Sequence, residues 1–331
     1  MLFTITHITK LGYSHEISES VMEVRAMPRI DERQVLRQFE LTVSPNVKTS
    51  HHKDWLENTV HQFSVLSVHD EVEVRARSIV ETRPVEWVLS QFGARLDGLI
   101  RDHRSWDFLQ YHGPVVDDPA LPALSKRLGL DDVRQVGQAI DIVLQHTRDV
   151  ISYRKGATTS ASTVGDVLQA GAGVCQDFAH LSLALLRRVG VPCRYVSGYL
   201  YKEVGAELET HAWVEAFVPG VGWIGLDPTH GVMVSEDYVT IAVGRSYADV
   251  PPNRGVYRGK ADESIHVNVA MERIDERARL TPYSTAIERP HRQPQSGIPM
   301  APLKFNLGLE QQRIHPNAVG VIVQQQRQQQ Q

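Results

Sequence analysis

The chain has 331 residues, 35 basic and 39 acidic side chains, and a formal net charge of −4 at pH 7. This length suffices for one large hydrophobic core or for two domains. The nearly balanced charge supplies no basic stripe of the kind that binds nucleic acid, and no run approaches the ~20 apolar residues of a membrane helix. We therefore expect a globular protein with neither nucleic-acid nor membrane partners.

Residues 1–83 are predicted to form a small antiparallel β-domain. Short runs with alternating side chains are separated by turn residues, as in Glu40–Ser44, Gln62–Val65 and Val72–Ala76. Such a domain could shape substrate access or serve as an interface, and the sequence favours neither role. The first seven residues, Met1–His7, lack the charged and then apolar regions of a signal peptide. Together with only two cysteines, this favours a reducing, cytoplasmic location.

Residues 84–170 are predicted to be helical and to begin a second domain that extends to residue 275. The helical pattern is clearest in residues 133–150, where apolar side chains recur at spacings of three and four. Residues 171–275 are predicted to hold a further helix from Cys175, with one buried face, that ends at Gly190 and Pro192. Strands follow at 193–201, 211–218 and 223–226, and the domain closes with the run 264–270.

The chain loses this periodicity from about residue 276. Prolines interrupt residues 276–302, and the last eight residues, Gln324–Gln331, are rich in glutamine. We expect residues 276–331 to form a largely disordered tail in which residues 303–307 dock locally.

Cys175 is the strongest candidate for a functional residue. It lies in the first turn of its predicted helix, behind Gly171 and Gly173, where unpaired backbone N–H groups and the helix dipole favour a thiolate. The alternative is a small buried cysteine that only packs, which is the role we expect of Cys193. The polar pair Gln176 and Asp177 argues against simple packing at Cys175.

His211 and Asp227 lie near the two far ends of the predicted hairpin that follows. If Val218 paired with Trp223, the two side chains would point to opposite faces of the sheet. A shift of one residue places Asp227 opposite Trp213, with His211 as its diagonal neighbour on the same face. A catalytic role for both residues therefore predicts the shifted register.

Cys175, His211 and Asp227 in this order have the chemistry of a Cys-His-Asp triad. His211 would take the thiol proton, and Asp227 would orient the imidazole and stabilise its charged form. The backbone N–H of Cys175 is the expected first oxyanion donor, and the sequence does not identify a second. Taken singly, His211 could be an ordinary strand histidine and Asp227 the first residue of an Asp-Pro turn.

The chain resembles the bacterial transglutaminase-like proteins over roughly residues 1–275. The matching segments are Gly173–His180, Gly190–Leu200, His211–Ala216, Gly222–Thr229 and Val243–Pro252, together with 27–29 and 54–58 near the amino terminus. The resemblance implies an α+β, papain-like core, in which a helix carrying the cysteine packs on an antiparallel sheet carrying the histidine and aspartate. It also implies that Cys175, His211 and Asp227 are the triad and that neither a metal nor an organic cofactor is needed.

Three residues depart from the pattern of this family. Ser246 stands where aspartate is usual, His230 where asparagine follows Asp-Pro-Thr, and Cys193 where a small residue such as alanine is common. None removes a triad member. His230 could change the polarity of the pocket and hence the choice of substrate.

We therefore expect a thiol-dependent enzyme that transfers the acyl group of a peptide or isopeptide-type amide through a thioester on Cys175. Hydrolysis, as in a peptidase or amidase, is preferred over transamidation because water is abundant. The alternative is a non-catalytic module that binds a peptide or protein in the same cleft. The histidines at 51, 52 and 61 lack the spacing of metal ligands, so no metal site is expected there. The sequence does not predict the oligomeric state.

Overall fold

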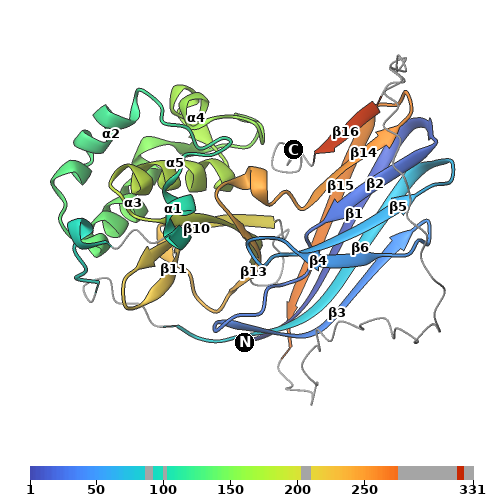
Figure 1. Cartoon of the computed structure of the whole chain (residues 1–331), viewed down its shortest axis with the longest axis horizontal. Coiled ribbons are helices and arrows are strands. Elements are labelled where there is room, and N and C mark those ends of the chain that lie inside the picture. Colours follow the sequence, from blue (N-terminus) through green and yellow to red (C-terminus); the bar gives the residue numbers. More distant parts are fainter. Residues whose placement is uncertain (86–91, 100–102, 203–209, 275–318, 324–331) are drawn as a thin grey trace, which may run out of the picture.

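The computed structural model describes residues 1–85, 92–99, 103–202, 210–274 and 319–323. Figure 1 shows two bodies, one built of long strands and one in which helices cover a sheet. This agrees with the predicted α+β class and with the β-rich amino-terminal region. Among the helices that the structure describes, none combines the length and apolar character needed to cross a membrane.

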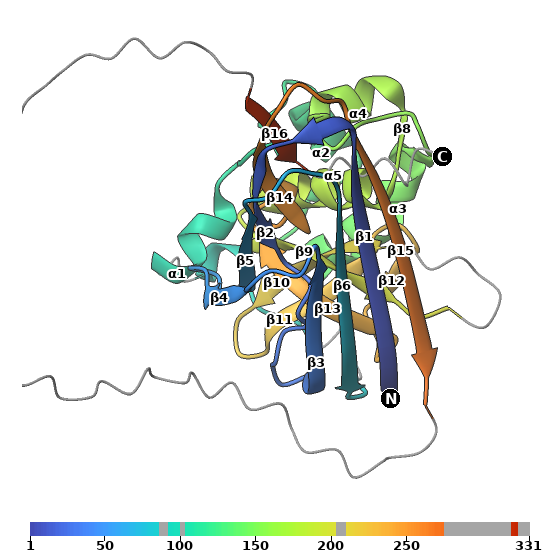
Figure 2. The same ribbon diagram turned by 90° about the vertical axis from the view of Figure 1, so that its right-hand side faces the viewer.

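Two facing antiparallel sheets form the strand-rich body. One has the order β15-β1-β6-β3 and the other β16-β14-β2-β5-β4, and Figure 2 shows the long strands of the first lying side by side. Alternate side chains of both sheets meet in a core that includes Leu11, Met22, Phe63 and Val72. The strands are β1 (Leu2–Ile17), β2 (Glu19–Val24), β3 (Gln34–Ser44), β4 (Ser50–Lys53), β5 (Thr59–Val65), β6 (His69–Thr82), β14 (Asn253–Arg258), β15 (Glu263–Arg273) and β16 (Val319–Val323).

The strands β14 and β15 correct the predicted domain limits. We predicted that residues up to 275 belong to the second domain, but β14 pairs with β2, and β15 pairs with β1 from Phe3↔Arg273 to Tyr13↔Glu263. A strand's alternation reveals its two faces but not its partner, so the sequence assigned this stretch to the nearer domain. Residues 84–250 are thus inserted between β6 and β14.

The second body contains a five-stranded antiparallel sheet of order β12-β11-β10-β9-β13. Its strands are β9 (Cys193–Leu200), β10 (Thr210–Val218), β11 (Gly222–Asp227), β12 (Val232–Met233) and β13 (Tyr238–Gly244), and two short strands, β7 (Ser152–Tyr153) and β8 (Ala172–Gly173), pair separately. The helices are α1 (His103–Trp106), α2 (Leu121–Arg127), α3 (Val136–Val150), α4 (Val164–Ala170) and α5 (Cys175–Arg188), with 3₁₀ turns at Leu96–Gly98, Asp107–Leu109, Leu130–Asp132 and Tyr247–Asp249.

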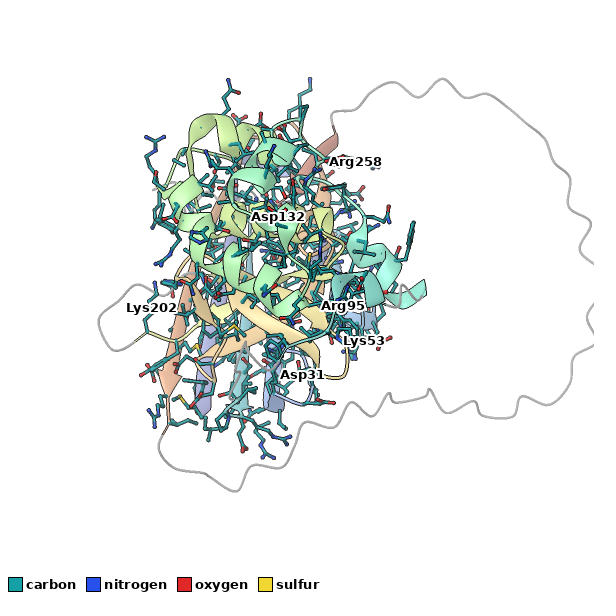
Figure 3. The ribbon with its side chains drawn as sticks, turned by 90° about the vertical axis from the view of Figure 1, so that its left-hand side faces the viewer. Asp31, Lys53, Arg95, Asp132, Lys202 and Arg258 are labelled. Carbon is teal, nitrogen blue, oxygen red and sulfur yellow. The ribbon has the colours of Figure 1, made fainter. Side chains whose placement is uncertain are left out.

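Side chains of the strand-rich body bind the edge strand β13 of this sheet. The Asn58 amide accepts from the Val243 N–H and donates to its carbonyl oxygen, both at 2.9 Å. Gln34 binds the N–H and carbonyl of Thr240 in the same way, both at 2.8 Å. Each amide thus takes the place of a neighbouring strand and satisfies an edge that would otherwise be open. Figure 3 labels Asp31, in the segment leading into Gln34, beside the strands of this sheet.

A buried ion pair and shared apolar packing strengthen this contact between the bodies. Glu215 of β10 is fully buried. It binds Arg33 of the strand-rich body and, at 2.6 Å, Arg194 of β9. The largest hydrophobic core runs from Phe3 of β1 through the helices to the sheet. The two bodies therefore share one continuous interior.

One strand of the predicted tail, β16, is described, and it pairs with β14. The other residues of the tail, including 303–307 and the glutamine-rich end, lie outside the described residues.

Candidate active site

Cys175 is the first residue of α5, as the sequence predicted. Asp177 caps this helix because its Oδ2 accepts from the backbone N–H of Val174 at 2.8 Å and from the Thr158 hydroxyl at 2.6 Å. Gly173 permits the cap, since a Cβ there would lie 2.5 Å from the same Oδ2. Cys175, only 2% exposed, therefore sits at the positive end of a helix whose entry is fixed by a buried carboxylate.

The helix α5 differs from its predicted form, with one buried face, because every residue from Cys175 to Arg187 is buried. It packs among the other helices on one side and against β9 and β10 on the other (Figure 1). Its polar residues are accommodated by hydrogen bonds. Arg187, for example, donates to the backbone oxygens of Phe108, Gln110, Cys193 and Arg245. The helix is thus held firmly, which fixes the position of Cys175.

The hairpin of β10 and β11 has the shifted register that a catalytic role for His211 and Asp227 predicted. Val214 pairs with Leu226 and Phe217 with Trp223, so Asp227 comes level with Trp213. His211 is then the diagonal neighbour of Asp227, and its Nε2 lies 2.7 Å from the Asp227 Oδ2. The predicted register, and with it the contact between these two residues, is confirmed.

Cys175 completes this chain of contacts, because its side chain shares a hydrogen bond with the His211 ring. Since Nε2 faces Asp227, Nδ1 is the ring nitrogen that faces the thiol. Burial of His211 opposes its charged form, but the hydrogen bonds to Asp227 and Cys175 outweigh burial and raise its pKa to about 10. Burial likewise opposes the charge of Asp227, yet the two histidines beside it hold the pKa of its carboxyl well below the usual range. His211 is therefore an imidazolium at neutral pH, next to an ionised Asp227.

Asp227 has more partners than the sequence predicted. Besides His211, its Oδ2 accepts from the Nδ1 of His230 at 2.7 Å and from the Tyr238 hydroxyl at 2.8 Å. Its Oδ1 accepts from the backbone N–H groups of Thr229 at 2.9 Å and His230 at 3.2 Å. The Asp-Pro turn signals the backbone contacts. The contact with Tyr238 depends on the tertiary fold, and no local sequence pattern predicts it.

The side chains of His211, Asp227 and His230 bring together three atoms of the kinds that bind metal ions. Two ligands bound to one zinc ion at the usual 2.0–2.1 Å lie about 3.3 Å apart. Both histidine nitrogens instead lie 2.7 Å from the same oxygen, a hydrogen-bonding distance. The arrangement therefore fits proton-mediated contacts between the three side chains.

The remaining residues considered from the sequence have varied surroundings. Trp213 is fully buried and stacks on His211 with ring centroids 6.1 Å apart. Tyr153 is 48% exposed and lies on β7 opposite Gly173, two residues before Cys175. His180 is fully buried and accepts from the Tyr247 N–H, and burial lowers its pKa to about 3, so it does not act as the base for Cys175. Cys193 is a buried free thiol, as predicted, and burial raises its pKa to about 11.

The two bodies match two family descriptions. Residues 123–228 match the transglutaminase-like superfamily, and residues 3–81 match the bacterial transglutaminase-like N-terminal region. The first range contains Cys175, His211 and Asp227.

Known proteins resemble the chain over most of its length. An uncharacterized protein of Mycobacterium leprae is 31% identical over 277 residues, which cover 82% of this chain and 98% of that protein. A protein-glutamine gamma-glutamyltransferase of Pseudomonas aeruginosa is 27% identical over 201 residues, covering 56% of this chain and 30% of that protein. The crystal structure of a "putative cysteine protease" from Cytophaga hutchinsonii has a TM-score of 0.70 and 24% identity, covers 86% of this chain and 93% of that one, and shows the shared fold. The chain belongs to the transglutaminase-like superfamily, and it begins with the amino-terminal region characteristic of the bacterial members.

Proposed function

We propose that this protein is a thiol-dependent enzyme that cleaves or exchanges peptide or isopeptide-type amides, with hydrolysis preferred over transamidation. One observation carries this proposal: Cys175, His211 and Asp227 form a continuous hydrogen-bonded chain that starts at a helix amino terminus. This is the arrangement in which a thiol attacks a carbonyl carbon and a histidine moves the proton.

The first half of the reaction forms a thioester. The Cys175 sulfur attacks the amide carbonyl carbon, and the developing oxyanion is stabilised by the backbone N–H of Cys175 at the start of α5. The His211 imidazolium then gives its proton to the departing amine as the C–N bond breaks. Asp227 keeps the imidazole oriented and supports its charge through the contact at Nε2.

The second half transfers the acyl group. Neutral His211 takes a proton from water, which attacks the thioester carbon, and the Cys175 thiolate leaves with His211 again protonated. A primary amine in place of water gives transamidation with the same residues. Hydrolysis is preferred because water is abundant. The protein or peptide substrate, and a cytoplasmic location, are part of this proposal.

The test compares iodoacetamide labelling of Cys175 over about pH 5 to 9 in the native protein, His211→Ala and Asp227→Asn, because only the thiolate reacts. Cys193, buried and with its pKa raised to about 11, is read in the same digest by peptide mass as an internal control. We expect Cys175 to label well below pH 8.5 and His211→Ala to move its profile upward. A profile typical of a free thiol, unchanged by either substitution, would exclude the enzyme and leave the peptide-binding module as the better account.

Hydrolysis and transamidation are then separated with one glutamine-containing peptide library. Each peptide is incubated with and without a labelled primary amine, and ammonia release is compared with incorporation of the label. Ammonia without incorporation supports hydrolysis, whereas incorporation that matches ammonia release overturns the preference for water.

A further inference from the structure

Asp227 is shared by two histidines that differ in their access to solvent. His211 is buried at 9% exposure, whereas the side chain of His230 is 41% exposed, and both rings bind the same oxygen at 2.7 Å. Because a carboxylate only accepts, the Nδ1 of His230 carries the proton in this contact. The triad carboxylate is thus connected to the surface through a second imidazole.

The backbone fixes His230 in this place. Asp227 ends β11, and the Gly231 N–H donates to the Asp227 carbonyl oxygen at 2.8 Å, closing a turn. Gly231 has φ near +69°, which favours glycine, and this conformation lets the chain turn back. The backbone N–H of His230 also binds Oδ1 of Asp227. Ring and backbone of one residue therefore hold both carboxylate oxygens.

We propose that His230 is a positioning residue of this site, which holds the Asp227 carboxylate toward His211 and thereby keeps the His211 ring placed against Cys175. This inference rests on the proposed function. An asparagine at this position could donate the same hydrogen bond through its amide, whereas an alanine could not.

The contacts around Asp227 show what His230 contributes. The two histidine rings lie 5.3 Å apart and bind the same Oδ2, while Cys175 bonds to the other nitrogen of the His211 ring. Without the His230 ring, Tyr238 is the one side chain besides His211 that these contacts leave on Oδ2. The carboxylate is then held less firmly toward His211.

Side chains from other elements also reach this turn. Asp227 and His211 face it from β11 and β10, and the Tyr238 hydroxyl reaches the same carboxylate from β13. Arg148 of α3 approaches from the adjoining helix, since its guanidinium would lie about 2.8 Å from a Cβ on Gly231. These groups do not change in the variants below, so the difference between variants reports on His230.

A matched control exists on the surface of α3. His146 binds Asp149 through Nδ1 and Oδ2 at 2.9 Å, with the same spacing of three residues, but the Asp149 side chain is 71% exposed while Asp227 is buried. His146→Asn therefore removes an equivalent histidine–aspartate contact that is screened by water and involves none of Cys175, His211 and Asp227.

The experiment measures the rate of iodoacetamide labelling of Cys175 between about pH 4.5 and 9 in the native protein, His230→Asn, His230→Ala and His146→Asn. We expect His230→Asn to label close to the native rate, because its amide can donate the hydrogen bond that the His230 Nδ1 donates to Asp227. His230→Ala, which loses the hydrogen bond to a buried carboxylate, should be slower by about tenfold at all pH values. His146→Asn should match the native profile.

The outcomes separate this inference from the proposed function. If native Cys175 labels as a free thiol and His211→Ala changes nothing, the proposed function fails. If the native profile shows the activated thiol but His230→Ala coincides with His146→Asn at every pH, only the role of His230 is overturned. Thermal unfolding of each variant, followed by circular dichroism, separates a lost fold from a lost contact.

Discussion

Replacing Asp227 by asparagine tests the electrostatics of the site through stability alone. Asparagine keeps the shape of aspartate and can still accept a hydrogen bond from the His211 Nε2, but it carries no charge. Because contacts with Asp227 and Cys175 outweigh burial and raise the pKa of His211 to about 10, the folded protein binds the His211 proton more tightly than the unfolded chain does. The native state is therefore stabilised by this proton at low pH.

The sign and the size follow from linkage. The contribution is complete below about pH 6.5, the ordinary histidine value, and is lost as the pH rises toward 10. At about 1.4 kcal/mol for each pH unit, the full contribution is about 5 kcal/mol, and Asp227 and Cys175 share it, so the loss of Asp227 removes up to this amount. For 331 residues, an unfolding entropy of about 2.1 cal/mol/K per residue converts this to about 7 °C in Tm.

The assay is thermal unfolding of the native protein and Asp227→Asn at several values between about pH 6 and 10. We expect Tm of the variant to be lower by up to about 7 °C near pH 6.5 and the difference to shrink as the pH approaches 10. Asp149→Asn, which removes an exposed carboxylate, should change Tm by about 1 °C or less at every pH. A difference between native protein and Asp227→Asn that stays constant from pH 6 to 10 would refute the reasoning.

Three other predictions follow from the described contacts. Asn58→Ala leaves the buried N–H and carbonyl of Val243 without their side-chain partner and should lower the free energy of unfolding by about 2 kcal/mol in urea titrations. Asn268 is exposed, so the control Asn268→Ala should change this free energy by less than about 0.5 kcal/mol. Glu215→Gln removes a fully buried charge that is paired with two partly exposed arginines and should cost about 3–5 kcal/mol. The half-buried Glu81→Gln should cost about 1 kcal/mol or less, and equal losses would contradict the role of burial. Dialysis against EDTA should leave the labelling rate of Cys175 unchanged, because the contacts of Asp227 have hydrogen-bond lengths, and a loss restored by zinc would show a metal site.

The sequence was sufficient to predict that Cys175, His211 and Asp227 come together, because the elements that carry them are marked locally. The helix after Cys175 and the two strands carrying His211 and Asp227 are each marked by short-range patterns and turn residues. Requiring that His211 and Asp227 meet then selected one of two registers, and the structure has that register. Patterns of a few residues and one geometric condition thus determine the arrangement.

The parts that the sequence did not predict depend on distant segments. The periodicity of α5 indicated one buried face, but helices and strands from elsewhere in the chain cover all of its sides. The partners of β14 and β15 lie more than 200 residues earlier, and the amides of Gln34 and Asn58 bind β13 across a similar distance. His230 was noted only as an unusual residue, because its contact with Asp227 depends on how the turn closes.

The insertion of residues 84–250 between β6 and β14 determines the order in which the protein can be completed during synthesis. When β6 has left the ribosome, β1 and β2 each still lack the neighbour that β15 and β14 will supply. Translation at about 5–20 residues per second adds the missing strands roughly 10–40 s later. Until then the nascent chain carries two open strand edges, which are sites for misassociation with other chains. Any truncation placed before residue 253 makes that temporary state permanent. The two sheets of the strand-rich body can therefore be completed only after the second body has been synthesised.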